Sequence, residues 1–90
     1  MNRDTKDFTF NIYPNPVKLK LQIEYRIDKK TNVDITLYSI NGKRLQGIYK
    51  RNLFPGSYSD IMDCSMLPSG SYMLRLITGD KDVNEVIIKE

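Results

Sequence analysis

The side chains that most often carry out catalysis in proteins are scarce in this sequence. Histidine is absent, and Cys64 is the single cysteine among the 90 residues. Without an imidazole the chain can form no Ser-His-Asp or Cys-His arrangement and no histidine-bound metal site. We expect Cys64 to be a small buried hydrophobe rather than a nucleophile, and one cysteine can form no intrachain disulfide.

The acidic side chains are scattered over turns and strand ends rather than grouped. They include Asp28, Asp60, Asp63, Asp80, Asp82 and Glu85. Glycoside hydrolysis needs two carboxyl groups at a defined separation in a cleft, and a domain of this size offers little cleft. Asp80 and Asp82 fall short of the about six to eight oxygen ligands that calcium takes. With no Gly-rich phosphate loop either, we expect no enzymatic activity, no metal site and no cofactor.

Length and charge narrow the class of protein further. Ninety residues make one domain with no room for a second core. The 14 basic and 11 acidic residues leave a net charge of +3, spread along the chain, so we expect no nucleic-acid binding. No apolar run approaches the length of a membrane span, and there is no signal peptide. If the protein reaches the cell surface, we expect the signal peptide for export to lie upstream of these residues.

Apolar residues recur at every second position over most of the chain, which predicts half-buried β-strands. The longest alternation runs from Leu19 to Ile27. The residues expected inside are Leu19, Leu21, Ile23, Val33, Ile35, Leu37, Tyr72, Leu74 and Leu76. Shorter strands are expected at Phe8–Ile12, Arg44–Tyr49, Tyr58–Met62 and Val83–Lys89. Nowhere does a helical period appear.

Turn residues separate these strands. Tyr13-Pro14-Asn15-Pro16-Val17 predicts a rigid kink at a sheet edge. Asn41-Gly42 predicts a hairpin with a type I′ turn. Pro68-Ser69-Gly70 predicts a reversal that leads into a central strand, with Gly70 as well as Gly42 at positive φ. About seven short strands with frequent turns indicate an all-β, immunoglobulin-like antiparallel β-sandwich. Periodicity alone leaves a small barrel open as the alternative.

Three tyrosines could serve a different function. Tyr38, Tyr49 and Tyr58 could form a platform on which sugar rings stack. Tyrosine is also a common strand residue with its hydroxyl at the rim of a sheet, and we prefer this second interpretation.

Three sequence blocks in this order resemble one known family. They are Tyr13-Pro14-Asn15-Pro16-Val17, then Val33–Tyr38 followed by Asn41-Gly42-Lys43, then Asp63-Cys64-Ser65-Met66-Leu67-Pro68-Ser69-Gly70-Ser71-Tyr72. Together they resemble the type A C-terminal sorting domain of the type IX (Por) secretion system of Bacteroidota. The family residues are Tyr13, Pro14, Asn15, Pro16, Asn41, Gly42, Lys43, Asp63, Leu67, Gly70, Tyr72 and Lys89. Members commonly end in a basic-apolar tail, which Val86-Ile87-Ile88-Lys89 matches, while Glu85 and Glu90 depart from it.

The resemblance implies a role in protein export. Residues 10–90 would be the sorting domain, and residues 1–9 a polar linker that runs into the first strand. A larger cargo protein would lie on the N-terminal side, which would make this chain a fragment and Met1 an expression start. The expected partners are the outer-membrane translocon and a sortase-like peptidase that removes the domain. The cargo would pass through the periplasm to the cell surface or the medium, often linked to anionic lipopolysaccharide.

The sequence also allows a second function and self-association. One alternative is a carbohydrate-binding or purely structural β-sandwich of an extracellular enzyme. An exposed last strand would also allow pairing between copies of the chain. If the export machinery reads Lys89 directly, Lys89→Ala should weaken export and leave melting unchanged, because the strand would be kept.

Overall fold

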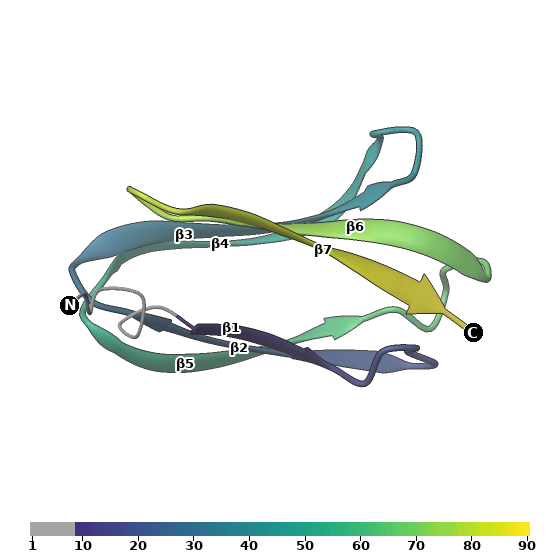
Figure 1. Ribbon diagram of the computed structural model, residues 1–90, viewed down its shortest axis with the longest axis horizontal. Helices are drawn as coiled ribbons and strands as arrows, with labels where there is room; N and C mark the ends of the chain where they lie inside the picture. Colours follow the sequence, from purple (N-terminus) through teal and green to yellow (C-terminus); the bar gives the residue numbers. More distant parts are fainter. Residues whose placement is uncertain (1–8) are drawn as a thin grey trace, which may run out of the picture.

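The computed structural model describes residues 9–90, which form seven β-strands and no helix, arranged in two layers (Figure 1). The strands β1 (Thr9–Tyr13), β2 (Lys20–Ile27) and β5 (Gly56–Asp63) form one sheet in the order β1-β2-β5. The strands β3 (Thr31–Ser39), β4 (Arg44–Leu53), β6 (Gly70–Ile77) and β7 (Asp82–Lys89) form the other in the order β4-β3-β6-β7. All pairings between these strands are antiparallel.

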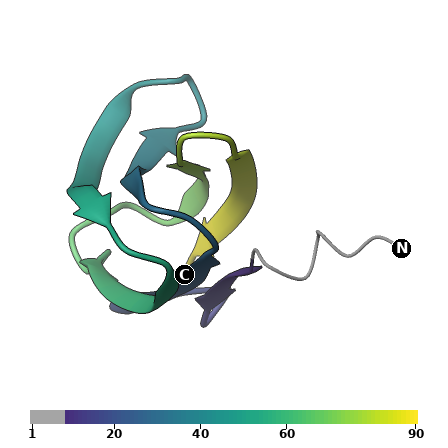
Figure 2. The same cartoon turned by 90° about the vertical axis from the view of Figure 1, so that its left-hand side faces the viewer.

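This arrangement confirms the predicted β-sandwich. The two sheets stay separate and face each other across one core, as the end-on view in Figure 2 shows, so the chain does not close into a barrel. The strand that follows Pro68-Ser69-Gly70 lies between β3 and β7, so its predicted central position is also confirmed. Residues 9–90 include no helical segment with the length and apolarity that a membrane crossing requires.

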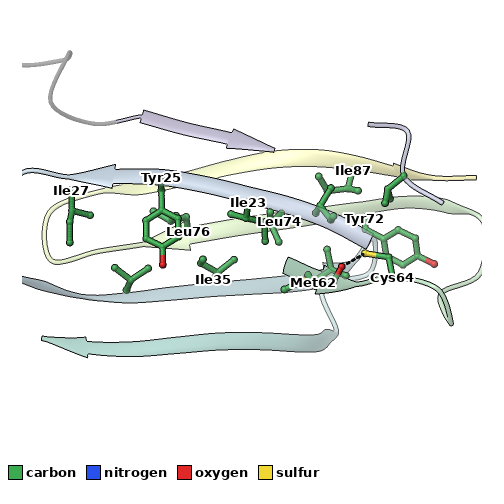
Figure 3. Close-up of a cluster of buried hydrophobic side chains, with 14 residues drawn as sticks. Ile23, Tyr25, Ile27, Ile35, Met62, Cys64, Tyr72, Leu74, Leu76 and Ile87 are labelled. Carbon is green, nitrogen blue, oxygen red and sulfur yellow. Dashed lines mark hydrogen bonds between the residues drawn. The ribbon is translucent and has the colours of Figure 1, made fainter. Parts of the chain in front are cut away.

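The core consists of the inward-facing residues of both sheets (Figure 3). Every residue expected inside, apart from Leu19, is buried. The core also takes in Val17, Tyr25, Ile27, Met62, Cys64 and Ile87. Because side chains alternate along a strand, the outward positions of β2 between these residues carry Lys, Gln, Glu and Arg.

The prediction for Leu19 is wrong, since its side chain is 64% exposed. The chain bends at Lys18 and Leu19 and enters β2 only at Lys20, which breaks the alternation that the sequence suggests. The Leu19 carbonyl accepts a hydrogen bond from the Cys64 backbone N–H at 2.7 Å. Val17, two residues earlier, is fully buried instead.

Other strands differ from the sequence prediction in extent. β4 continues to Leu53, beyond the expected end at Tyr49. β7 has the expected position, but Ile87 is buried while Val86 and Ile88 are exposed on the outer face. Phe8, expected to begin the first strand, lies outside the described residues.

A polar chain of contacts ties the two sheets together along the side formed by β4 and β5. The Tyr25 hydroxyl donates to Asp60 Oδ2 at 2.7 Å, and Lys50 Nζ on the opposite sheet lies 2.6 Å from Asp60 Oδ1. Burial raises the pKa of Tyr25, and the hydrogen bond to Asp60 raises it further. Tyr25 therefore stays neutral and positions the Asp60 carboxylate for Lys50.

Two leucines give a matched test of this core. Leu74 is fully buried and Leu19 is exposed, so both changes remove the same atoms from different surroundings. We expect Leu74→Ala to lower the free energy of unfolding by about 2–5 kcal/mol because it leaves a cavity. Leu19→Ala should change it by less than about 0.5 kcal/mol, as surface substitutions usually do. Chemical denaturation of both variants measures the difference, and similar losses in the two would contradict the core described here.

Candidate functional site

The three sequence blocks meet at one end of the sandwich. The strand register brings the end of β1 beside the start of β2, the start of β2 beside the end of β5, and the end of β3 beside the start of β6. Gly70, the first residue of β6, pairs with Lys89 near the C-terminus of the chain. We call this region the motif end; it consists of Tyr13–Val17, Ile40–Lys43, Asp63–Tyr72 and Val86–Glu90. In Figure 1 it lies on the right, with the C-terminus, while β1 begins at the opposite end.

The segment Asn15–Val17 lies along the outer edge of β7. The Asn15 side chain donates from Nδ2 to the Val86 carbonyl and accepts from the Ile88 N–H at Oδ1, both at 2.9 Å. The Val17 N–H donates to the Ile88 carbonyl at 2.8 Å, and the Val17 carbonyl accepts from the Glu90 N–H at 2.9 Å. A strand edge has a row of unpaired backbone groups. Asn15 and Val17 therefore act as a short parallel strand that covers the C-terminal half of this edge.

Two prolines shape that segment. The peptide bonds Tyr13-Pro14 and Asn15-Pro16 are both cis. The chain bends at Asn15 and Pro16, so the kink expected from the sequence is present after the edge strand β1, and it carries the chain across to β7. The Tyr13 hydroxyl donates to Glu24 Oε2 at 2.6 Å on the neighbouring strand β2.

The turn from Asp63 to Tyr72 is held by its own side chains. Asp63 Oδ1 accepts from the Ser65 N–H at 2.9 Å, and hydrogen bonds from Ser65 lower the pKa of Asp63. Leu67 packs against the core, and the Tyr72 hydroxyl donates to the Pro68 carbonyl four residues upstream. A tyrosine at the start of this strand that bonds back to the preceding turn is the tyrosine corner of immunoglobulin-like domains. Tyr72 is buried as its spacing predicts, and its hydrogen bond to the turn is a second role that was not predicted from the sequence.

The hairpin at Asn41-Gly42 forms, but the predicted type I′ turn is wrong. Type I′ needs positive φ at both central residues, and within residues 9–90 only Asn52 among non-glycines has positive φ. The Gly42 N–H instead donates to the Ser39 carbonyl at 2.9 Å, and Gly42 itself has φ of 91°. Ile40 and Asn41 are thus the central residues of an ordinary turn, and Gly42 follows in the left-handed conformation. The prediction of positive φ at Gly42 and Gly70 is confirmed, with 149° at Gly70.

Lys89 is largely enclosed, with only 9% of its surface exposed. It has the same parity as the buried Ile87 on β7, so its stem lies on the inner side of the strand. Its Nζ donates to the Glu90 carbonyl at 3.2 Å. This burial overturns the expectation that Lys89→Ala would leave melting unchanged, because alanine would remove buried methylene groups as well as the charge.

The three tyrosines proposed as a sugar platform do not lie together. Tyr38 and Tyr49 are on β3 and β4, whereas Tyr58 lies on β5 in the other sheet. The Tyr58 ring stacks on Tyr25 with 5.8 Å between centroids, and its hydroxyl donates to the Phe54 carbonyl at 2.6 Å. The structure therefore gives no support to a shared stacking surface.

The described residues show no arrangement for catalysis at the motif end. Cys64 is fully buried, and burial raises the pKa of its thiol, so the reactive thiolate is disfavoured. Within residues 9–90 no three histidine, cysteine or acidic side chains are grouped as metal ligands. What the motif end offers is a fixed shape that exposes turns and strand ends.

Comparison with known proteins points to one family. Residues 11–90 match the family model described as the secretion system C-terminal sorting domain. No curated protein matches the chain. The match covers all three sequence blocks and the last strand.

The two hydrogen bonds between Asn15 and β7 give the first prediction for the motif end. Asn15→Ala removes two hydrogen bonds and should lower the free energy of unfolding by about 1–2 kcal/mol. It should also speed hydrogen exchange at the Ile88 amide. Asn11→Ala on β1 is the matched control, since the Asn11 side chain is exposed and makes no hydrogen bond within residues 9–90. Unchanged exchange at Ile88 in Asn15→Ala would show that Asn15 does not hold this edge.

The Asp63 turn gives a prediction on pH. A lowered pKa in the folded state means that the Asp63 carboxylate stabilises the fold above its unfolded pKa of about 3.9, and that this contribution is lost as pH falls through the folded pKa. We expect Asp63→Ala to lower the melting temperature near pH 6, and the difference from wild type to shrink in stronger acid. Ser65→Ala removes the side-chain hydrogen bond and should return the Asp63 pKa part of the way to its ordinary value in an NMR titration. An ordinary Asp63 pKa in the wild type would contradict the turn geometry.

Proposed function

The chain belongs to the secretion system C-terminal sorting domain family, whose members are sorting signals for type IX secretion, and from this premise we propose that the motif end is the surface that the export machinery recognises. The family assignment implies a cargo protein and export to the cell surface or the extracellular space. We further propose that the cargo is joined before residue 10, that it crosses the periplasm, and that the outer-membrane translocon and a sortase-like peptidase are the direct partners. The domain would be residues 10–90, with residues 1–9 as the linker.

One observation supports the motif end above other surfaces. The family blocks are far apart in the sequence, yet the strand register gathers them with the C-terminal residues at one end of the sandwich. The other end holds the start of β1, where a cargo would be attached (Figure 1). Separate ends for cargo and machinery let a large cargo be carried without covering the surface that is recognised.

The carbohydrate-binding alternative is not favoured. Sugar-binding surfaces on β-sandwiches need aromatic side chains on one face, and Tyr38, Tyr49 and Tyr58 are divided between two sheets. No feature of the described residues favours it over the sorting function.

A fused reporter tests the assignment. Placed behind a signal peptide and in front of this chain, a reporter should leave cells that have the type IX system and stay in the periplasm of cells that lack the translocon. Equal secretion with and without the chain, in the same competent strain, would contradict the sorting function.

Lys89 allows a sharper test of recognition. Deleting Val86–Glu90 is a poor test, because it also removes the partners of Asn15 and Val17 and exposes the core. Lys89→Met keeps a long apolar stem and removes the charge, so melting should change little while export falls. Lys29→Met is the control, because Lys29 pairs with Asp80 at the opposite end. Equal export of the two variants would show that the export machinery does not recognise the Lys89 ammonium group. It would not contradict the sorting function.

A further inference from the structure

The outer edge of β7 is covered over one half only. Val86 and Ile88 direct backbone groups away from β6, toward Asn15 and Val17. The direction of the backbone N–H and C=O groups alternates along an antiparallel strand. The N–H and C=O of Asn84 and the N–H of Val86 therefore also point outward, away from β6. Within residues 9–90 no side chain or backbone group from outside the β6 ladder bonds to them. The segment Asp82–Val86, which we call the free half, is an open sheet edge about 16 Å long.

A single charge marks the inner side of this free half. Glu85 has the same parity as Ile87 and Lys89 and pairs with the fully buried Leu74, yet it is exposed and has no ion pair within residues 9–90. Proteins place inward-pointing charges on edge strands to block pairing with unsuitable strands. Glu85 is also one of the two positions, with Glu90, where the C-terminal segment departs from the basic-apolar pattern.

An apolar row lies on the outer face beside the free half. Tyr38, Met73 and Val86 are direct cross-strand neighbours on β3, β6 and β7. They line a shallow groove of about 400 Å³, with the hairpin residue Ile40, 79% exposed, at its wall. Arg75 in this groove is neutralised by Asp82, with two hydrogen bonds at 2.7 and 2.9 Å. The row ends at the open edge, where an added strand would continue it.

We propose that the free half of β7 is a strand-addition site for an extended partner segment with the pattern apolar, basic, apolar. The Asn84 N–H and C=O and the Val86 N–H supply the backbone bonds of such an addition. An apolar side chain next to Val86 extends the outer row, and a lysine or arginine next to Glu85 satisfies the charge that repels other strands. Directly opposed charges of opposite sign stabilise a strand pair, and like charges destabilise it.

The free half of a second copy does not meet these requirements, because it carries Asp82 and Glu85 and no basic residue. Pairing of two free halves therefore offers Glu85 no basic residue to face, since Arg75 is already bound to Asp82. Glu85 thus disfavours pairing between the free halves of two copies, and favours a basic partner strand at this edge.

The inference deepens the proposed function and rests on it in one respect, since the partner strand would belong to the export machinery. The site itself can be tested without export. A test segment Thr-Val-Lys-Val-Thr is joined to Glu90 by a Gly/Ser linker of ten residues, whose r.m.s. length of about 17 Å reaches back along the edge to Val86. Tethering holds the segment at millimolar effective concentration, which compensates for the weak affinity of a short peptide. The control tether is Thr-Val-Glu-Val-Thr.

Amide hydrogen exchange at Asn84 and Val86, followed by NMR, is the readout. The lysine tether should protect both amides about fivefold more than the glutamate tether. Glu85→Gln should remove the difference, and Glu85→Lys should invert it. Asn84→Pro removes an outward N–H and no ladder bond, so it should abolish protection at Val86 while melting of the untethered chain stays close to wild type.

Three results would overturn the proposal. In the first, neither tether protects the two amides in the folded chain. In the second, protection does not depend on the charge at position 85, and in the third the untethered chain forms dimers that protect these amides. Absence of the expected protection together with normal reporter export would contradict the strand-addition site but not the sorting function. Protection as expected without reporter export would remove the sorting role and leave the site.

Discussion

The structure depends on how the backbone of β7 finds partners on both of its sides. Only β6 lies beside it in the sheet, and the C-terminal half of its other side is covered by a segment that precedes β2. Asn15 does this with a side-chain amide, which has the same donor and acceptor as a peptide group, and Val17 does it with its backbone. Because Val17 must reach β7 to make these bonds, it enters the core, and the chain has to bend before it can begin β2. The exposed Leu19 and the enclosed stem of Lys89 are both consequences of this closure.

Much of the fold could be predicted because period-two alternation is a local property. Leu21, Ile23, Val33, Ile35, Leu37, Leu74 and Leu76 face the core as their spacing indicates. Leu19 fails because periodicity cannot show where a strand starts, and a contact with β7, about seventy residues later, decides that. The Asn41-Gly42 hairpin is similar: the sequence identifies the turn, while the left-handed Gly42 follows an ordinary turn at Ile40 and Asn41 instead of lying inside a type I′ turn. The polar tie between Tyr25, Asp60 and Lys50 joins three strands, so no local pattern could predict it.

The site was predicted by resemblance and explained by structure. Most of the family residues have a physical task at the motif end: Asn15 covers an edge, Asp63 closes a turn, Tyr72 ties its strand to that turn, and Gly70 takes the positive φ with which β6 begins. Nothing in the structure explains a requirement for the charge of Lys43. A family pattern of this kind records the conditions for building one rigid end of a sandwich. On the proposed function, the partner would recognise a shape that only a correctly folded chain presents.

The positions of the two outermost strands have a mechanical consequence. β1 begins at one end of the sandwich and β7 finishes at the other, so a pull between cargo and machinery would act along the strands (Figure 1). Hydrogen bonds in antiparallel sheets are perpendicular to the strands, so such a load shears many of them at once and does not open them one after another. The bonds between Val17 and β7 join the first part of the chain to the last and carry part of this load. If cargo and machinery are attached at opposite ends as proposed, the domain would therefore resist a force that acts between them.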